Sequence, residues 1–284
     1  MKRRDKYNSC LLVLALCISM TILAGCQGIK KTESDEKQKV SETAVVETQS
    51  ETSVETDSKA EVSATKETGS ETVQASESAL DSDFQIHMIE MGDEVYNRIY
   101  DRSYVDNADV ALSDLRYLTV LHYDYDHQVQ SGELIVHKDV AENVIDIFKE
   151  LYAEEYEIES MRLIDDYWIE GDPAASDSYS IENNNTSAFC YRVITGGDYL
   201  SNHAYGCAID LNPLQNPYVL FEDGETYCTD CSVQYIDREQ DDPHIIREGD
   251  ICWTIFKEHG FEWGGSWENP IDYQHFEYRH EKLD

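Results

Sequence analysis

The distribution of large apolar side chains along the 284 residues is what most constrains how this chain can fold. Residues 30–83 consist mainly of Ser, Thr, Glu, Ala and Val, and they contain neither an aromatic residue nor a proline. Such a stretch cannot bury enough apolar surface to offset the entropy lost on ordering, so we expect it to be disordered. Its fourteen acidic and six basic residues repel one another on balance and favour extended conformations. The sequence therefore predicts a flexible tether over residues 26–85 and one folded domain over residues 86–284.

The predicted domain is strongly acidic. It has forty-three acidic and twelve basic residues, which gives a net charge of −31 when the histidines are neutral. That charge argues against nucleic acid and against anionic polymers bound by bulk electrostatics. It fits a role in extracellular solubility equally well, and it does not identify a substrate. We expect a monomer without a nucleic-acid partner.

The N-terminus has the pattern of a secretion signal. Four basic residues between positions 2 and 6 precede an apolar run over residues 11–23, which is short for a membrane span. The run ends in Leu23-Ala24-Gly25-Cys26, which resembles the lipobox of bacterial lipoproteins. The resemblance implies a signal peptide over residues 1–25, a lipid on Cys26 and a location on the extracellular face of the cell membrane. The alternative is a plain signal peptide or an uncleaved anchor.

The sequence does not determine whether the cysteines form disulfides. Five of them lie in the predicted domain, namely Cys190, Cys207, Cys228, Cys231 and Cys252. Outside the cytoplasm Cys228 and Cys231 could form a short-loop disulfide, and the odd total would leave at least one free thiol. A structural zinc at this pair is disfavoured because no second C-x-x-C accompanies it. Small, buried, unpaired side chains are the alternative for most of the five.

Two helices can be expected from spacing and caps. Residues 139–153 begin with Asp139 and Glu142 in the pattern of a capping box, and apolar residues then recur at helical spacing. Asp250 is positioned to cap a second helix that runs to residue 259, with Gly260 as the left-handed stop. In this second helix the inward residues should be Ile251, Ile255 and Phe256.

The strand signals are shorter and mixed with the helices. Residues 117–125 and 132–137 predict a hairpin around a polar connection at 126–132. Further strands are expected at 159–166, 189–194, 207–212 and 274–279. Because the order lacks βαβ regularity, the class is α+β, with a central antiparallel sheet and flanking helices.

Four residues near the C-terminus combine the groups that a hydrolytic zinc site needs. Such a site takes about three His or carboxylate ligands, leaves a position open for water, and requires a nearby carboxylate to accept that water's proton. His203 lies in a Gly-containing turn, and Asp210 lies in an apolar run where an unpaired carboxylate would be costly. His275 is flanked by aromatic residues and follows Asp272 by three positions, so it can supply a nitrogen while Asp272 acts as the base. The other histidines of the domain have no such setting and are taken as surface or core residues.

The same segments resemble the family of zinc D-alanyl-D-alanine carboxypeptidases, D-Ala-D-Ala dipeptidases and L-alanyl-D-glutamate endopeptidases. The family pattern S-x-H-x-x-G-x-A-x-D matches residues 201–210, W-G-G-x-W matches residues 263–267, and [DE]-x-x-H matches Asp272 with His275. Each motif alone is weak, but together they are specific. The resemblance spans roughly residues 87–279 and implies a hedgehog-like or DD-peptidase-like fold with a zinc cleft open at one edge of the sheet.

The resemblance also implies roles for individual residues. It makes His203, Asp210 and His275 the ligands of Zn2+ and Asp272 the general base. Glu277 is a rival base, although on a strand it would share a face with His275 and would more naturally be a partner of that ligand.

Two further residues receive roles from the same resemblance. Arg192 would stabilise either the developing oxyanion or the carboxylate of the substrate. Ser201 would bind substrate or orient the loop that carries the first ligand. A hydroxyl that only caps this loop is an equal alternative for Ser201.

The substrate implied is a peptidoglycan stem peptide, with removal of terminal D-alanine as the expected reaction. Aspartate at position 272, where the dipeptidases have glutamate, argues against free D-Ala-D-Ala as the substrate. The rival reaction is endopeptidase cleavage between L-Ala and D-Glu. A catalytically silent wall-binding lipoprotein is the rival from another functional class, but it would be expected to have lost a ligand or the base.

Overall fold

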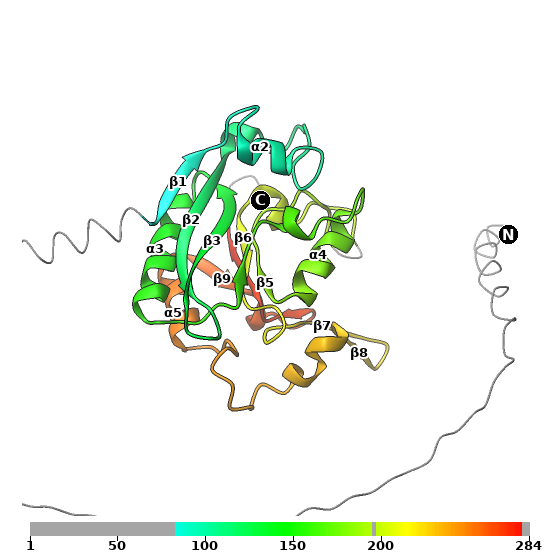
Figure 1. The fold of residues 1–284 in the computed structure, drawn as a ribbon. Coiled ribbons are helices and arrows are strands. Elements are labelled where there is room, and N and C mark those ends of the chain that lie inside the picture. The colour runs from blue at the N-terminus through cyan, green and yellow to red at the C-terminus, as the bar shows by residue number, and fades with distance from the viewer. Residues whose placement is uncertain (1–82, 195–196, 280–284) are drawn as a thin grey trace, which may run out of the picture. The chain divides into compact units, whose positions relative to one another are not determined.

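The computed structural model describes residues 83–194 and 197–279 (Figure 1). The predicted signal peptide, the lipidation site at Cys26 and nearly all of the tether lie outside the described residues. The folded part begins slightly before residue 86, because Phe84 is buried in the core and the first strand starts at Gln85. Within the described ranges no helix is both long and apolar enough to cross a bilayer.

The described chain is a mixed α/β structure with few helices. Its α-helices are α2 (Glu94–Ile99), α3 (Ala141–Ala153), α4 (Pro173–Glu182) and α5 (Ile251–Glu258). Its longer strands are β1 (Gln85–Met88), β2 (Leu115–Tyr123), β3 (Val129–His137), β7 (Tyr218–Glu222) and β11 (His275–Tyr278). Its strands of two or three residues are β4 (Ser160–Met161), β5 (Asn185–Thr186), β6 (Ala208–Asp210), β8 (Glu225–Tyr227), β9 (Phe261–Trp263) and β10 (Ile271–Asp272).

The sheets are several and small. Three antiparallel sheets have the strand orders β1-β2-β3, β10-β7-β8 and β6-β11-β9, and β4 pairs with β5 in parallel. The α+β class agrees with this arrangement, but the single central sheet that we predicted was wrong. Strands of two or three residues, separated by 3₁₀ turns and loops, are too short to extend one sheet across the domain.

The predicted hairpin is present as β2 and β3, paired from Leu115 with His137 to Tyr123 with Val129. Its connection is residues 124–128, shorter than the 126–132 we expected. The reason is that the Asp124 carboxylate accepts the N–H groups of Asp126 and Gln128 and closes the turn early.

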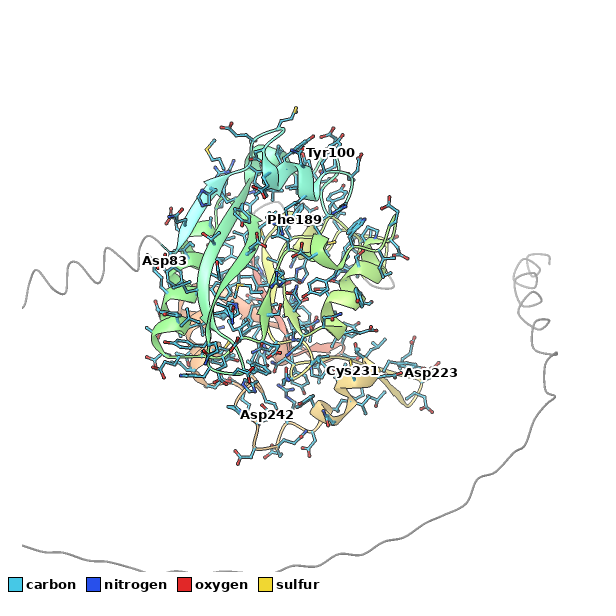
Figure 2. The ribbon with its side chains drawn as sticks, viewed as in Figure 1. Asp83, Tyr100, Phe189, Asp223, Cys231 and Asp242 are labelled. Carbon is cyan, nitrogen blue, oxygen red and sulfur yellow. The ribbon has the colours of Figure 1, made fainter. Side chains whose placement is uncertain are left out.

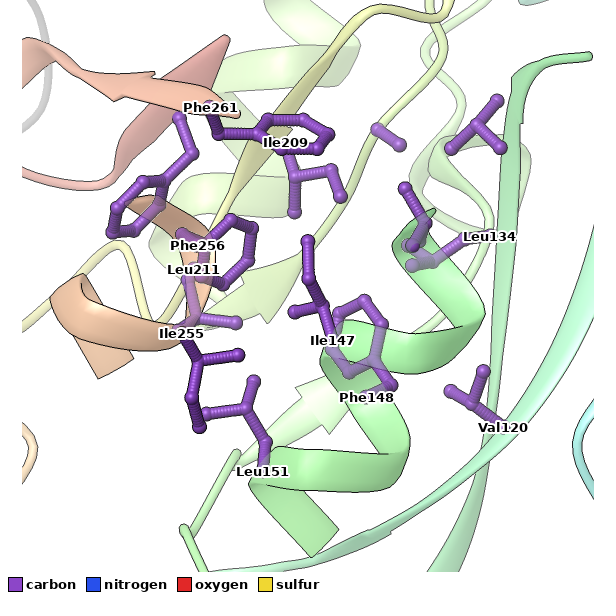
Figure 3. Packing of buried hydrophobic residues seen from close by; sticks show 14 of the residues in the cluster. Val120, Leu134, Ile147, Phe148, Leu151, Ile209, Leu211, Ile255, Phe256 and Phe261 are labelled. Atoms are coloured by element: carbon purple, nitrogen blue, oxygen red, sulfur yellow. The ribbon is translucent and has the colours of Figure 1, made fainter. Parts of the chain in front are cut away.

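Helix α3 provides the centre of the core (Figure 3). Its buried face includes Ile147, Phe148 and Leu151, which pack with Ile255 and Phe256 of α5 and with residues of β2, β3 and β6. The capping box was a wrong prediction, since the N-cap is Val140 without a side-chain bond and the Asp139 carboxylate lies 3.4 Å from His137 instead.

Helix α5 begins as predicted, with the Asp250 carboxylate accepting the Trp253 N–H at 2.7 Å. It stops before Gly260, whose φ of 85° is left-handed. The predicted inward position of Ile251 was wrong, because this side chain is 43 % exposed. Cys252 is buried in its place, at the i, i+3, i+4 spacing that it forms with Ile255 and Phe256.

The remaining strand predictions hold in part. Strands β6 and β11 lie inside the predicted stretches 207–212 and 274–279. Stretch 159–166 forms only β4 and then turns into a 3₁₀ helix at Ile164–Tyr167. Stretch 189–194 forms no strand among its described residues, only an isolated bridge between Val193 and Leu200.

The five cysteines of the domain are free thiols. Cys190, Cys207 and Cys252 are buried, as expected for small side chains in a core. Cys228 and Cys231 lie just after β8, in the peripheral segment where Figure 2 labels Cys231 and Asp223. No disulfide links the described residues in this structure.

Candidate metal and catalytic site

The three predicted zinc ligands come from three neighbouring elements. His203 lies in the 3₁₀ turn η3 (Asn202–Tyr205), Asp210 ends β6, and His275 begins β11. Strands β6 and β11 are antiparallel with Asp210 directly opposite His275, so the register itself places these two side chains together. Gly206 ends η3 at a φ of 69°, and a Cβ there would lie 2.6 Å from the backbone nitrogen of His137. Only glycine allows the turn to fold this closely against β3.

The donor atoms of the three residues form a compact triangle. The distance from His203 Nε2 to His275 Nδ1 is 3.2 Å, from His275 Nδ1 to Asp210 Oδ1 it is 3.0 Å, and from His203 Nε2 to Asp210 Oδ1 it is 3.3 Å. Tetrahedral zinc with bonds of about 2.0–2.1 Å separates its ligand atoms by about 3.3 Å. All three side chains are buried. The donor set and its spacing therefore fit a divalent metal such as zinc.

The second nitrogen of each histidine is held by a partner. His203 Nδ1 lies 2.5 Å from the carbonyl oxygen of Ala188, and His275 Nε2 lies 3.2 Å from Glu277 Oε2. These acceptors favour a proton on the outer nitrogen and a lone pair on the inner one, which is the tautomer that ligates a metal. Glu277 also accepts a hydrogen bond from Asn202, so its carboxylate is engaged beside His275.

The buried charges of this cluster stabilise one another. Burial opposes ionisation of Asp210, but the charge of His203 and the hydrogen bonds from His203 and His275 hold its pKa well below the ordinary value. Burial also opposes the charge of His275, yet its bonds to Asp210 and Glu277 raise its pKa to about 10. The hydrogen bonds to Asp210 place protons on the inner ring nitrogens, and a divalent cation at this position would replace those protons while the outer ones stay in place.

Asp272 lies in β10, next to the cluster and opposite Tyr218 of β7. Burial, together with the negative charge of Asp210, raises the pKa of Asp272 to about 7. Its Oδ1 atom is buried and accepts no hydrogen bond from the described residues. A carboxyl group that changes protonation near neutral pH, with one free oxygen, is suited to act as a general base and then as an acid.

The Trp-Gly-Gly segment supports the stretch from Asp272, at the end of β10, to His275, at the start of β11. A Cβ at Gly264 would lie 2.7 Å from the Asp272 carbonyl oxygen and 3.2 Å from His275 Cβ, so a larger residue would push the two apart. Trp263 donates its indole N–H to the Tyr273 carbonyl oxygen at 2.8 Å. The motif thus acts by packing against the backbone of the ligand segment.

Ser201 and Arg192 occupy different surroundings. The Ser201 hydroxyl accepts the His203 N–H at 3.3 Å and caps η3, so it orients the ligand loop; substrate binding by Ser201 stays a prediction. Arg192 donates from Nη2 to Asp177 Oδ2 at 2.6 Å, and its charge acts on the pKa of Asp272. Arg192 is therefore close to the cluster, although it does not contact the ligands.

Asp177 is the site residue that sequence reasoning missed. It comes from α4, fifteen positions before Arg192, and lies outside every motif that was recognised. The only nearby signal was Asp172 followed by Pro173, a helix start that would have placed Asp177 on a helix. Nothing in the sequence indicated which face of that helix is buried.

Comparison with known proteins adds one match. No curated protein and no solved structure matches this chain. Residues 195–278 match the family model described as D-alanyl-D-alanine carboxypeptidase. The matched segment contains His203, Asp210, Asp272 and His275. Residues 195–278 are therefore similar to the D-alanyl-D-alanine carboxypeptidase family, and the match supports a peptidase.

Proposed function

We propose that this protein is a zinc peptidase that removes terminal D-alanine from peptidoglycan stem peptides. The observation that carries the proposal is the triangle of His203 Nε2, Asp210 Oδ1 and His275 Nδ1, with edges of 3.0–3.3 Å, beside the free oxygen of Asp272. A zinc ion held by these atoms would supply Lewis-acid polarisation of the scissile carbonyl and of the attacking water.

The chain's own residues divide the remaining work. The free Oδ1 of Asp272 accepts the proton of the attacking water and then delivers it to the leaving amine. Glu277 keeps the His275 ring oriented and its outer nitrogen protonated, through the contact at 3.2 Å. Arg192 supplies a fixed positive charge near the cluster, which is suited to the terminal carboxylate of the substrate. Asp272 is buried and Glu277 and Arg192 are partly buried, which limits bulk water and strengthens their electrostatic interactions.

The complete set of ligands and base disfavours a catalytically silent wall-binding protein. Aspartate at 272 is compatible with both carboxypeptidase and endopeptidase action. The positive charge of Arg192 favours the carboxypeptidase reaction. An enzyme that cleaves within the stem does not have to bind a free C-terminal carboxylate.

We also propose that the protein is anchored by lipid on Cys26 at the extracellular face of the cell membrane. The supports are the basic and apolar pattern of residues 2–23 and the sequence Leu23-Ala24-Gly25-Cys26. Mass spectrometry of the protein purified from membranes should find residue 26 as the N-terminus with acyl chains attached. An N-terminus at residue 1 would contradict the anchor.

The activity is tested by digestion of purified muropeptides with the chain from residue 27 onward, supplied with zinc, and mass spectrometry of the products. Loss of one alanine mass from pentapeptides, and nothing else, is the expected result. Release of stem fragments would assign the endopeptidase reaction instead. The Asp210→Asn variant should be inactive, whereas His259→Gln should be active, because the His259 side chain bonds to Glu150 of α3 and is no part of the candidate site. No cleavage by the zinc-loaded chain would refute the proposal.

A further inference from the structure

The ion pair between Arg192 and Asp177 is the one Arg–carboxylate pair of the described residues that lies beside the candidate site with both partners nearly buried. Their side chains are 10 % and 12 % exposed, and the joining distance is 2.6 Å. The negative charge of Asp177 and the positive charge of Arg192 both act on the Asp272 carboxyl. The pair therefore belongs electrostatically to the site, although neither residue is a candidate ligand.

Not every N–H donor of the Arg192 guanidinium has an acceptor. Nη2 donates to Asp177 and Nη1 donates to the Val193 carbonyl oxygen at 3.3 Å. The Nε atom is buried and meets no acceptor among the described residues. The Nε atom of Arg238 is in the same state. What sets Arg192 apart is its place beside the candidate site, where a buried cation with an unpaired N–H has capacity left for a ligand.

A comparison within the same molecule shows what a purely structural pair looks like. Arg98 donates from Nη1 and Nη2 to the two carboxylate oxygens of Glu133, at 2.7 and 3.0 Å. That bidentate geometry uses the full capacity of the carboxylate. Asp177 instead binds a single nitrogen of Arg192 and leaves the Nε–H free.

Both partners are held by the structure around them. Asp177 lies on α4, which starts at the Asp172 cap and is tied to β5 by the bond from Asn185 to the Ser180 hydroxyl at 2.9 Å. The carbonyl oxygen of Arg192 accepts the Ser201 N–H at 3.0 Å, two residues before His203. The guanidinium is thus held by α4 through Asp177, and the Arg192 backbone is held by the residue that caps the ligand turn.

We propose that Asp177 is a positioning residue that holds the Arg192 guanidinium beside the candidate metal cluster, where it binds a carboxylate oxygen of the peptide substrate. This inference rests on the proposed function. Asp177 binds one edge of the guanidinium and fixes its rotation, while the other donors remain available for a second carboxylate. It also balances the charge of Arg192 when substrate is absent, which keeps a buried cation tolerable.

The test compares N-acetyl-L-lysyl-D-alanyl-D-alanine with its C-terminal amide, on the zinc-loaded chain. The wild type should prefer the free acid. Asp177→Asn should lose about tenfold in kcat/KM on the free acid, through KM, and should change little on the amide. Arg192→Met should lose the preference entirely, and the double variant should be no worse than Arg192→Met, because the two residues act as one unit.

Two controls separate positioning from stability. Glu133→Gln breaks the comparable pair with Arg98 and should lower the melting temperature while it leaves the preference for the free acid unchanged. Arg192→Lys keeps a cation for Asp177 but lacks the planar fork, so it should lose the preference even if Asp177→Asn fails to fold. Equal losses on acid and amide, or additive losses in the double variant, would overturn the inference.

Binding distinguishes failure of this inference from failure of the proposed function. The dissociation constants of the same two peptides are measured by calorimetry in the Asp272→Asn background, where turnover is blocked. A wild type that cleaves neither peptide would refute the peptidase, whereas the ratio of the two dissociation constants still tests Asp177. The dissociation constant of the amide divided by that of the free acid should fall about tenfold when Asp177→Asn is added. An unchanged ratio would overturn the role of Asp177.

Discussion

The substitution Asp272→Asn should make the metal-free protein more stable and, at the same time, nearly inactive. Asp272 is 9 % exposed, and burial with the nearby charge of Asp210 raises its pKa from 3.8 to about 7. A carboxyl group whose pKa is higher in the folded state binds protons more tightly there, so stability falls as the pH rises from about 4 to 7. Asparagine does not ionise and should escape this loss.

The magnitude follows from the two pKa values of Asp272, 3.8 and about 7. At 1.36 kcal/mol per pH unit, ionisation of Asp272 costs about 2 kcal/mol at pH 5 and about 4 kcal/mol at pH 8. The gain in unfolding free energy from Asp272→Asn should therefore be larger at pH 8 than at pH 5. Turnover of the zinc-loaded variant should meanwhile fall by about 10²–10⁴-fold, because the proton acceptor is gone.

The assay is urea unfolding in the presence of a chelator, at pH 5 and pH 8, followed by tyrosine and tryptophan fluorescence. Asp146→Asn is the matched control, because Asp146 lies on the exposed face of α3. It should leave the unfolding free energy nearly unchanged at both pH values. A gap between wild type and Asp272→Asn that does not grow with pH would refute the electrostatic account of Asp272. Near-normal turnover in this variant would move the role of base to Glu277.

Four other changes should have distinct effects. Chelation should abolish hydrolysis, and readdition of zinc should restore it together with a rise in melting temperature, since a ligand that binds only the folded state stabilises it. Asp210→Asn should reduce the zinc content measured by elemental mass spectrometry, and a fully loaded variant would argue against Asp210 as a ligand. Phe256→Ala should lower the unfolding free energy by about 3–5 kcal/mol. Phe256 is fully buried, and its ring stacks on that of Phe276 with 4.0 Å between the ring centroids. A loss below 1 kcal/mol would contradict that packing. Deletion of residues 30–60 should leave the melting temperature unchanged, and a drop of several degrees would mean that the tether packs on the domain.

Local signals in the sequence were sufficient where the structure is determined locally. The cap at Asp250 and the stop at Gly260 involve neighbours within four residues, and both appear as predicted. The start of α3 was misjudged because Asp139 has a competing partner in His137, which belongs to a strand. A preference for capping cannot reveal a competing contact of this kind, even from a residue only two positions away.

The prediction of the strands and of a single sheet was wrong for a related reason. Stretch 159–166 has the side chains of a strand, but only Ser160 and Met161 find a partner, in β5. Whether a strand extends depends on the length of the neighbouring strand, and β5 has only two residues. Period and composition describe one strand alone, so they overestimated both the length of the strands and the unity of the sheet.

In the candidate site, too, some residues can be recognised from sequence motifs and others only from the tertiary structure. The motif residues His203, Asp210 and His275 could be recognised because their chemistry is specific and their spacing is fixed by one turn and one strand pair. Asp177 has no such spacing, since it meets Arg192 only after α4 packs against β5 and the 3₁₀ helix Ile164–Tyr167. A lone aspartate on a polar helix is indistinguishable in sequence from a solvated one, and only its burial and the free Nε–H of Arg192 set it apart. Candidate metal ligands can therefore be proposed from motifs, whereas the role that we propose for Asp177 and Arg192 depends on a contact that the tertiary structure creates.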